Sequence, residues 1–197
     1  MLKIEKGDPW LMWPNNLVGN FVDDPANKIF DYQGNFNFTL EFELVEKVEL
    51  KSTLFAKLPS YFGLDIEPHG MTLILTTEDS NTEYIYLNYE WEVGKRYTLK
   101  ITKNKNILKY EINGLLIFNT LLTQLLKSDD NSHIIFGSGN FPVNGFNLNY
   151  MSVILHQLKI LKDNILISDH DFNIFIHSKS FDLTNNCNFI HRICQTN

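Results

Sequence analysis

This chain of 197 residues has little of three features that define large classes of proteins: cysteine, long apolar runs and clustered basic charge. Its only cysteines, Cys187 and Cys194, lie close together, and no Cys/His spacing resembles a zinc site. They can pair if they flank a bend, or stay free as small apolar residues. No stretch approaches the ~18 apolar residues of a membrane-spanning helix.

The charge balance argues against two further classes of partner. Lys and Arg total 17 against 23 Asp and Glu, which gives a formal net charge of −6, and no basic run exceeds two residues. Such a chain is poorly suited to neutralise nucleic-acid phosphates or an anionic membrane surface. We therefore expect no nucleic acid and no membrane as partner.

The first nine residues lack the apolar core of a secretory signal peptide. We therefore expect the chain to be made and folded in a host cytoplasm. It would then reach an exterior as part of a larger particle or by another export route.

Alternation of apolar and polar residues is abundant. It is strict from Phe38 to Leu44, which predicts a half-buried strand. It continues from Arg96 to Ile112, where Asn113-Gly114 supplies the two residues with positive φ that a type I′ hairpin turn needs. Further strands are predicted over 52–58, 61–66, 71–77, 82–88, 133–136 and 150–161, the last of them bent or bulged. Short strands at regular spacing predict a sandwich or barrel.

The chain divides into an arm and one domain. Residues 1–35 form an irregular N-terminal arm that Trp10, Trp13 and Phe21 would pack on the body or on a neighbour. Residues 36–197 form the domain, including closing strands at its C-terminal end.

One segment departs from the alternation. Its leucines recur at i, i+1, i+4 and i+5, a spacing typical of one or two helical turns. They are Leu121, Leu122, Leu125 and Leu126. We predict one short helix near 119–127.

Three stretches resemble the concanavalin A-like lectin/glucanase jelly roll in its laminin G-like form. Residues 38–42 resemble its first core strand, 91–102 with 108–114 its Trp-containing turn and hairpin, and 134–137 with 150–161 its closing pair. The resemblance implies an all-β fold, a two-sheet antiparallel jelly-roll sandwich. Members include lectins, glycan hydrolases, adhesion modules and virion surface modules, so the fold leaves the function open.

Carboxylate pairs are the first chemistry to test. The hydrolases of this fold carry Glu-x-Asp-x-x-Glu on one strand, and retaining hydrolysis needs two carboxyl groups ~5 Å apart. The nearest strings here are Glu41-Phe42-Glu43, Asp65-Ile66-Glu67 and Glu90-Trp91-Glu92. None reproduces the motif, so we predict no catalytic residue and no enzyme.

No cofactor and no metal ligand are predicted. Calcium stays an alternative because members of the family often bind it through Asp and Asn oxygens in loops. The candidates are Asp23-Asp24, Asp79 with Asn81, and Asp129-Asp130-Asn131. Each of them is also an ordinary polar turn.

Sugar binding would use an aromatic ring stacked on a pyranose face, with side-chain oxygens holding the hydroxyls. Tyr84, Tyr86 and Asn88 in a predicted strand, near Tyr89, have suitable side chains. Phe141 and Asn144 in a predicted loop form a second candidate. The competing interpretation is that these aromatic rings pack the sandwich or a protein interface.

Our leading hypothesis is a non-enzymatic structural or adhesion protein on the surface of a virus particle, a phage capsid or tail module. Its tail from 171 to 190 is similar to endings of phage structural proteins. Other virion proteins or identical subunits would be its partners, and a cell-surface glycan a further one. The alternatives are a lectin-like carbohydrate-binding module and a divergent glycan hydrolase.

Overall fold

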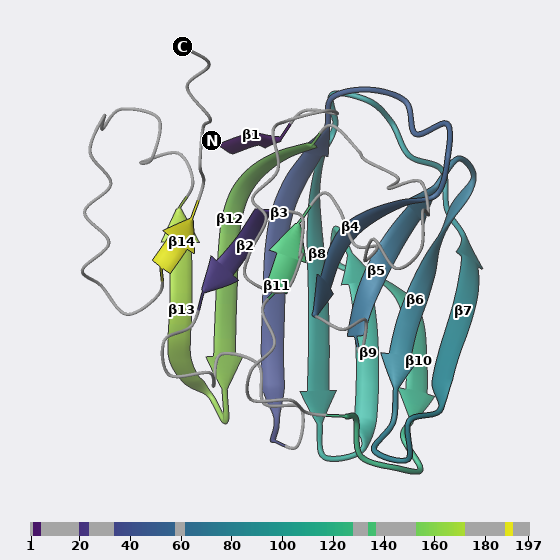
Figure 1. The fold of residues 1–197 in the computed structure, drawn as a ribbon, viewed down its shortest axis with the longest axis vertical. Helices are drawn as coiled ribbons and strands as arrows, with labels where there is room; N and C mark the ends of the chain where they lie inside the picture. The colour runs from purple at the N-terminus through teal and green to yellow at the C-terminus, as the bar shows by residue number, and fades with distance from the viewer. Residues whose placement is uncertain are drawn as a thin grey trace, which may run out of the picture.

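The computed structural model describes residues 2–4, 20–23, 34–57, 62–127, 134–136, 153–171 and 188–190. Within these ranges the chain consists of strands, turns and bends, without a helix, and the strands form two antiparallel sheets. Figure 1 shows the sheets stacked face to face, with β4 to β7 in front of β8 to β10. The predicted all-β, two-sheet fold is confirmed.

The first sheet has the strand order β1-β12-β3-β8-β9-β10, and β13 also pairs with β12. Its strands are β1 (Leu2–Ile4), β3 (Phe36–Leu44), β8 (Arg96–Asn104), β9 (Ile107–Ile112), β10 (Leu115–Leu121), β12 (Val153–Lys162) and β13 (Ile165–Asp171). A bulge between Leu155 and Gln157 interrupts the pairing of β12 with β3, which confirms the predicted irregular strand.

The second sheet has the order β14-β2-β11-β4-β5-β6-β7. Its strands are β2 (Asn20–Asp23), β4 (Ser52–Lys57), β5 (Phe62–Glu67), β6 (Gly70–Thr76), β7 (Thr82–Asn88), β11 (Ile134–Phe136) and β14 (Asn188–Ile190). In the described part of the chain, β7 and β10 are therefore the edge strands at one side of the two sheets, both drawn at the right of Figure 1.

The core lies between the sheets and is formed by every second side chain along strands such as β3. Alternate residues of β3, from Phe36 to Leu44, are buried while the residues between them are half-buried on the outer face. Phe38 of the first sheet stacks on Phe55 of the second with ring centroids 4.8 Å apart. Such ring contacts join the two layers, because aromatic side chains carry the largest apolar surface per residue.

The Asn113-Gly114 hairpin forms as predicted. Asn113 has φ 51° and Gly114 has φ 78°, the pair of positive values that defines a type I′ turn. The Asn113 side chain also accepts a hydrogen bond from the backbone N–H of Thr98 at 2.8 Å, which ties the turn to the neighbouring strand.

The predicted helix near 119–127 is wrong. Residues up to Leu121 belong to β10, and the segment after it crosses to the second sheet, where Leu126 bridges Thr77. The N–H of Lys127 donates to the carbonyl of Thr76 at 2.8 Å. The backbone groups pair across the sheets rather than within a helical turn. As a result Leu126 is buried while Leu121 is exposed.

The N-terminal segment contributes two strands that the sequence pattern did not indicate, and β14 lies in the C-terminal end where closing strands are predicted. β1 pairs with β12, and β2 lies between β11 and β14. The predicted contacts of Trp10 and Trp13 and the state of Cys187 and Cys194 lie outside the described residues, as do the side-chain contacts of Phe21.

Candidate functional site

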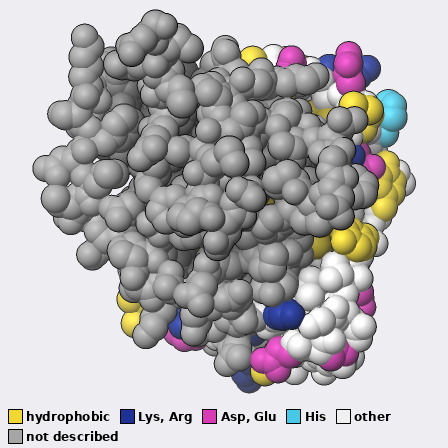
Figure 2. All heavy atoms as spheres, viewed as in Figure 1, with side chains coloured by type: hydrophobic (Ala, Val, Ile, Leu, Met, Phe, Trp, Pro, Cys, Tyr) yellow, Lys and Arg dark blue, Asp and Glu magenta, His cyan; other side chains and the backbone are white. Residues whose placement is uncertain are grey.

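The predicted residues Tyr84, Tyr86 and Asn88 lie together on the outer face of the edge strand β7, and we call them the tyrosine face. Tyr84 is 65% exposed and Tyr86 51% exposed. Ile85 and Leu87, between them, pack toward the core. Figure 2 shows hydrophobic, acidic, basic and histidine side chains together at the right edge of the molecule, where Figure 1 draws β7.

The hydroxyl end of Tyr86 is held over the start of the neighbouring strand. Its hydroxyl donates to the carbonyl of His69 at 3.2 Å. A methyl group placed on Gly70 would come within 2.7 Å of Tyr86 Cζ, so the phenol end of the ring lies directly over this glycine. The phenol end of Tyr86 therefore rests on the sheet, while the side chain as a whole remains half exposed.

The backbone of Gly70 is held in place by a side chain that packs against the core, Trp91. Trp91 Nε1 donates to the carbonyl of Gly70 at 2.7 Å. Trp91 packs edge-on against Tyr97 with centroids 5.0 Å apart and lies 4.4 Å from Tyr89. The Trp-containing stretch that resembles a family signature thus has a local role, because it supports the floor on which Tyr86 lies.

Tyr84 is paired with a cation from across the sheet. Lys51 Nζ lies 5.8 Å from the centroid of the Tyr84 ring, within the range of a cation–π contact. The same ammonium group lies 3.2 Å from Asp65 Oδ2 and 3.6 Å from Glu67 Oε1. Lys51 therefore joins the tyrosine face to two carboxylates of β5.

Hydroxyl groups complete this network beside the tyrosines. Thr53 donates to Asp65 Oδ1 at 2.7 Å, and Thr72 donates to Glu67 Oε1. Asp65 is only 5% exposed, so both its oxygens are occupied and shielded from solvent. A carboxylate held in this way stabilises the surface but is badly placed to attack or protonate a substrate.

The carboxylates of Glu41-Phe42-Glu43 and Glu90-Trp91-Glu92 also lie next to basic or histidine side chains. Glu41 binds Arg96, Glu43 lies 3.5 Å from His156, Glu90 lies 3.6 Å from His69, and Glu92 binds Lys95. Each carboxylate of the three candidate strings therefore has a cationic or histidine partner, as expected for structural charges.

Of the predicted loop sites, Asp79 with Asn81 is described and is an ordinary turn. Asp79 accepts hydrogen bonds from the Thr77 hydroxyl and from the N–H of Asn81, and Ser80 between them has φ 67°. The Thr77 hydrogen bond lowers the pKa of the Asp79 carboxyl. In the described ranges no three His, Cys, Asp or Glu side chains gather around one point. Residues 129–131, Asp24 and the side chain of Asp23 lie outside those ranges.

The remaining sugar-binding candidates are Tyr89, Phe141 and Asn144. Tyr89 is partly buried and packs against the core beside Trp91, so it does not belong to the tyrosine face. Phe141 and Asn144 lie outside the described residues. Sequence reasoning missed Lys51 and Thr72, since neither has a local pattern that reveals its partner on another strand.

No protein-family model matches the chain, and no curated protein matches it in sequence. Solved structures do share its fold. The binding domain of botulinum neurotoxin DC in complex with rat synaptotagmin II matches 85% of this chain with a TM-score of 0.57 and 12% identity. The receptor-binding domain of botulinum neurotoxin mosaic serotype C/D matches 78% of it with a TM-score of 0.53 and 19% identity.

A further match is the binding domain of botulinum neurotoxin serotype D, with a TM-score of 0.53, 17% identity and 80% of this chain covered. The chain spans only 38 to 40% of the length of these three structures. At such low identity the matches establish a shared fold. They leave the ligand of this chain to be argued from its own residues.

Proposed function

We propose that this chain is a non-enzymatic recognition module that binds carbohydrate through the tyrosine face. The observation that carries the proposal is Tyr86, whose phenol end is anchored over Gly70 while its side chain remains half exposed. A pyranose ring offers a patch of C–H groups to such a surface, and the electron-rich face of an aromatic ring attracts them.

Polar groups beside the rings suit the hydroxyls of a sugar. Asn88 extends the same row beyond Tyr86, and its amide offers a donor and an acceptor on an exposed strand end. Glu67 and Lys51 lie on the tyrosine side of the sheet, already bonded to each other and partly exposed. The surface is open rather than deep, which favours an extended glycan that lies across the strand.

Two further observations support a binding role over a catalytic one. The carboxylates of the three strings that resemble a hydrolase motif are each paired with a cation or histidine. The solved structures that share the fold include receptor-binding domains, and one of these was determined with synaptotagmin II. The fold therefore suits recognition of a cell-surface partner.

The test is an array of cell-surface and bacterial glycans probed with the intact chain and with Tyr84→Ala and Tyr86→Ala. We expect wild-type binding to at least one glycan, and a loss of about three- to tenfold for each tyrosine. Leu115→Ala is the matched control, because Leu115 is also 65% exposed on an edge strand but belongs to the other sheet. Silence across the array, or binding unchanged in both tyrosine variants, would contradict the proposal.

The structural subunit of a virus particle is a second candidate. Its support is a row of exposed aliphatic side chains at and around the edge strand β10 (Ile107, Leu115, Leu116, Leu121 and Leu125). Edge strands with apolar side chains pair readily with further copies of a chain. We expect light scattering to show an oligomer that Leu116→Lys with Leu121→Lys dissociates; a monomeric wild type at high concentration would count against it. A place on a virion surface stays a prediction.

A further inference from the structure

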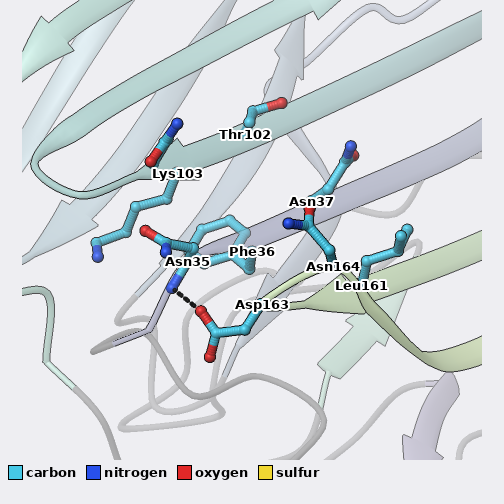
Figure 3. A pocket seen from close by; sticks show the side chains of 9 residues that line it. Asn35, Phe36, Asn37, Thr102, Lys103, Leu161, Asp163 and Asn164 are labelled. Atoms are coloured by element: carbon cyan, nitrogen blue, oxygen red, sulfur yellow. Dashed lines mark hydrogen bonds between the residues drawn. The ribbon is translucent and has the colours of Figure 1, made fainter.

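A small polar cleft opens on the outer face of the first sheet, away from the tyrosine face. Its volume is about 130 Å³. We call it the asparagine cleft, because four of its lining side chains are amides. The lining consists of Asn35, Phe36, Asn37, Thr102, Lys103, Asn104, Leu161, Asp163 and Asn164, shown in Figure 3.

The floor of the cleft is one row across three strands. Asn37 of β3 lies opposite Thr102 of β8 and, on its other side, opposite Leu161 of β12. All three belong to the half-buried outer positions of their strands. The row thus combines an amide, a hydroxyl and an aliphatic side chain at neighbouring positions of the sheet.

The wall of the cleft is the tight turn between β12 and β13. Asp163 and Asn164 have φ 46° and 66°, a left-handed pair that Asp and Asn tolerate better than other residues with side chains. Asp163 Oδ1 accepts a hydrogen bond from the N–H of Asn35 at 3.3 Å, and the N–H of Asp163 donates to the Asn35 carbonyl at 3.0 Å. These two bonds fix the turn against the start of β3, as the dashed line in Figure 3 shows for the first.

Several lining groups are left for a ligand. In the described part of the chain, no hydrogen bond occupies the side chains of Thr102, Asn104 or Asn164. Asn37 uses only its Oδ1, which accepts from the Thr39 hydroxyl at 3.3 Å. The cleft therefore presents amide donors, amide acceptors and a hydroxyl at once, a mixture that matches alcohols rather than ions.

The charges in the lining also favour a neutral ligand. Asp163 contributes a carboxylate and Lys103 an ammonium group. Lys103 is 3% exposed, and its Nζ donates to the carbonyl of Gly34 at 3.0 Å. One fixed charge of each sign leaves no net charge in the lining. The buried ammonium group works against a metal cation, and the carboxylate against an anion.

From this geometry we infer that the asparagine cleft binds a single neutral, hydroxyl-rich six-membered ring, one pyranose residue of a glycan. The cleft has a volume of about 130 Å³, so one ring of a glycan would lie partly inside it while the rest of the ligand stays outside. Leu161 would contact the C–H face of the sugar, and the amides with Thr102 would bond its hydroxyls. This site is independent of the tyrosine face, so either can exist without the other.

The experiment uses the intact chain labelled with ¹⁵N and the methyl pyranosides of glucose, galactose, mannose and N-acetylglucosamine. We expect at least one of them to shift the amide signals of residues 35–37, 102–104 and 161–164 with a millimolar Kd. Asn164→Gly keeps the left-handed turn while removing the side chain. Thr102→Val removes the hydroxyl at nearly constant shape. Each variant should weaken binding by about three- to tenfold.

Thr98→Val is the matched control, since Thr98 lies on the same outer face of β8, is equally half-buried and does not line the cleft. It should bind like the wild type. No shift with any of the four pyranosides would overturn the inference, and so would shifts that map elsewhere or persist at full affinity in Asn164→Gly and Thr102→Val. Thermal unfolding of each variant separates lost binding from lost folding.

Discussion

The two outer faces of this sandwich offer opposite kinds of surface. The tyrosine face lies on an edge strand, and its rings are about half exposed or more. The asparagine cleft is concave and polar, and it gathers amides at the end of the other sheet. The first suits a long ligand that contacts an open surface, and the second suits a single sugar ring that enters a concave site.

The difference lies in how each surface is supported. Gly70 supports the tyrosine face, because only a residue without Cβ lets the phenol end of Tyr86 lie against the strand. The asparagine cleft instead depends on a left-handed turn, because Asp163 and Asn164 adopt positive φ where they form its wall. Each site therefore depends on a backbone feature that can be changed without touching the other site.

The largest expected effect comes from Gly70→Ala. The new methyl group would lie 2.5 Å from the backbone oxygen of Leu87 and 2.7 Å from Tyr86, so the strand pair must shift. We expect a loss of about 1–3 kcal/mol of unfolding free energy, measured in urea, and loss of binding at the tyrosine face. Gly34→Ala beside the asparagine cleft is the control, because its nearest contact would be 3.4 Å. Equal stability of the two variants would refute this account.

The next largest effect is expected from Asn164→Val, which tests the left-handed turn that forms the wall of the asparagine cleft. A β-branched residue at φ 66° should cost about 1–3 kcal/mol, while Asn164→Gly should leave stability near that of the wild type. Thermal unfolding of both variants checks this. If Val and Gly behave alike, the turn does not hold the left-handed conformation.

A smaller effect is expected from Tyr86→Phe. It removes the hydrogen bond to the His69 carbonyl but keeps the ring over Gly70. Glycan binding should fall by about two- to fivefold, less than for Tyr86→Ala, and binding of a pyranoside in the asparagine cleft should not change. An identical loss for Phe and Ala would show that the hydroxyl, rather than the ring, makes the contact.

The smallest effect concerns Asp79, in the turn that joins β6 to the tyrosine-bearing strand. The Thr77 hydroxyl lowers the folded-state pKa of this carboxyl below its usual value of 3.8. Its contribution to stability is therefore present above that value and is lost as the pH falls through the lower, folded-state pKa. We expect Asp79→Asn to lower the Tm slightly at pH 7 and not at pH 2. A difference that persists in acid would assign the effect to shape instead.

Much of the fold could be predicted from alternation, because a period of two is a local property of the sequence. It located β3, β8 and β9, and it placed Tyr84 and Tyr86 on the same side of their strand, while the structure decided that this side is the outer one. The leucines after β10 gave a false helical signal, because backbone pairing with Thr76 and Thr77 decided that segment. No local pattern revealed Lys51 near Tyr84, since their contact crosses the sheet.

The sequence by itself determined the strands with strict alternation and the type I′ turn, because side-chain period and tolerance of positive φ act between neighbours in the chain. Only the tertiary structure decided which polar groups meet. Asn35 and Asp163 are 128 positions apart, yet they bond at one end of the asparagine cleft. Strand order and register bring such residues together, and burial of the core as a whole fixes both.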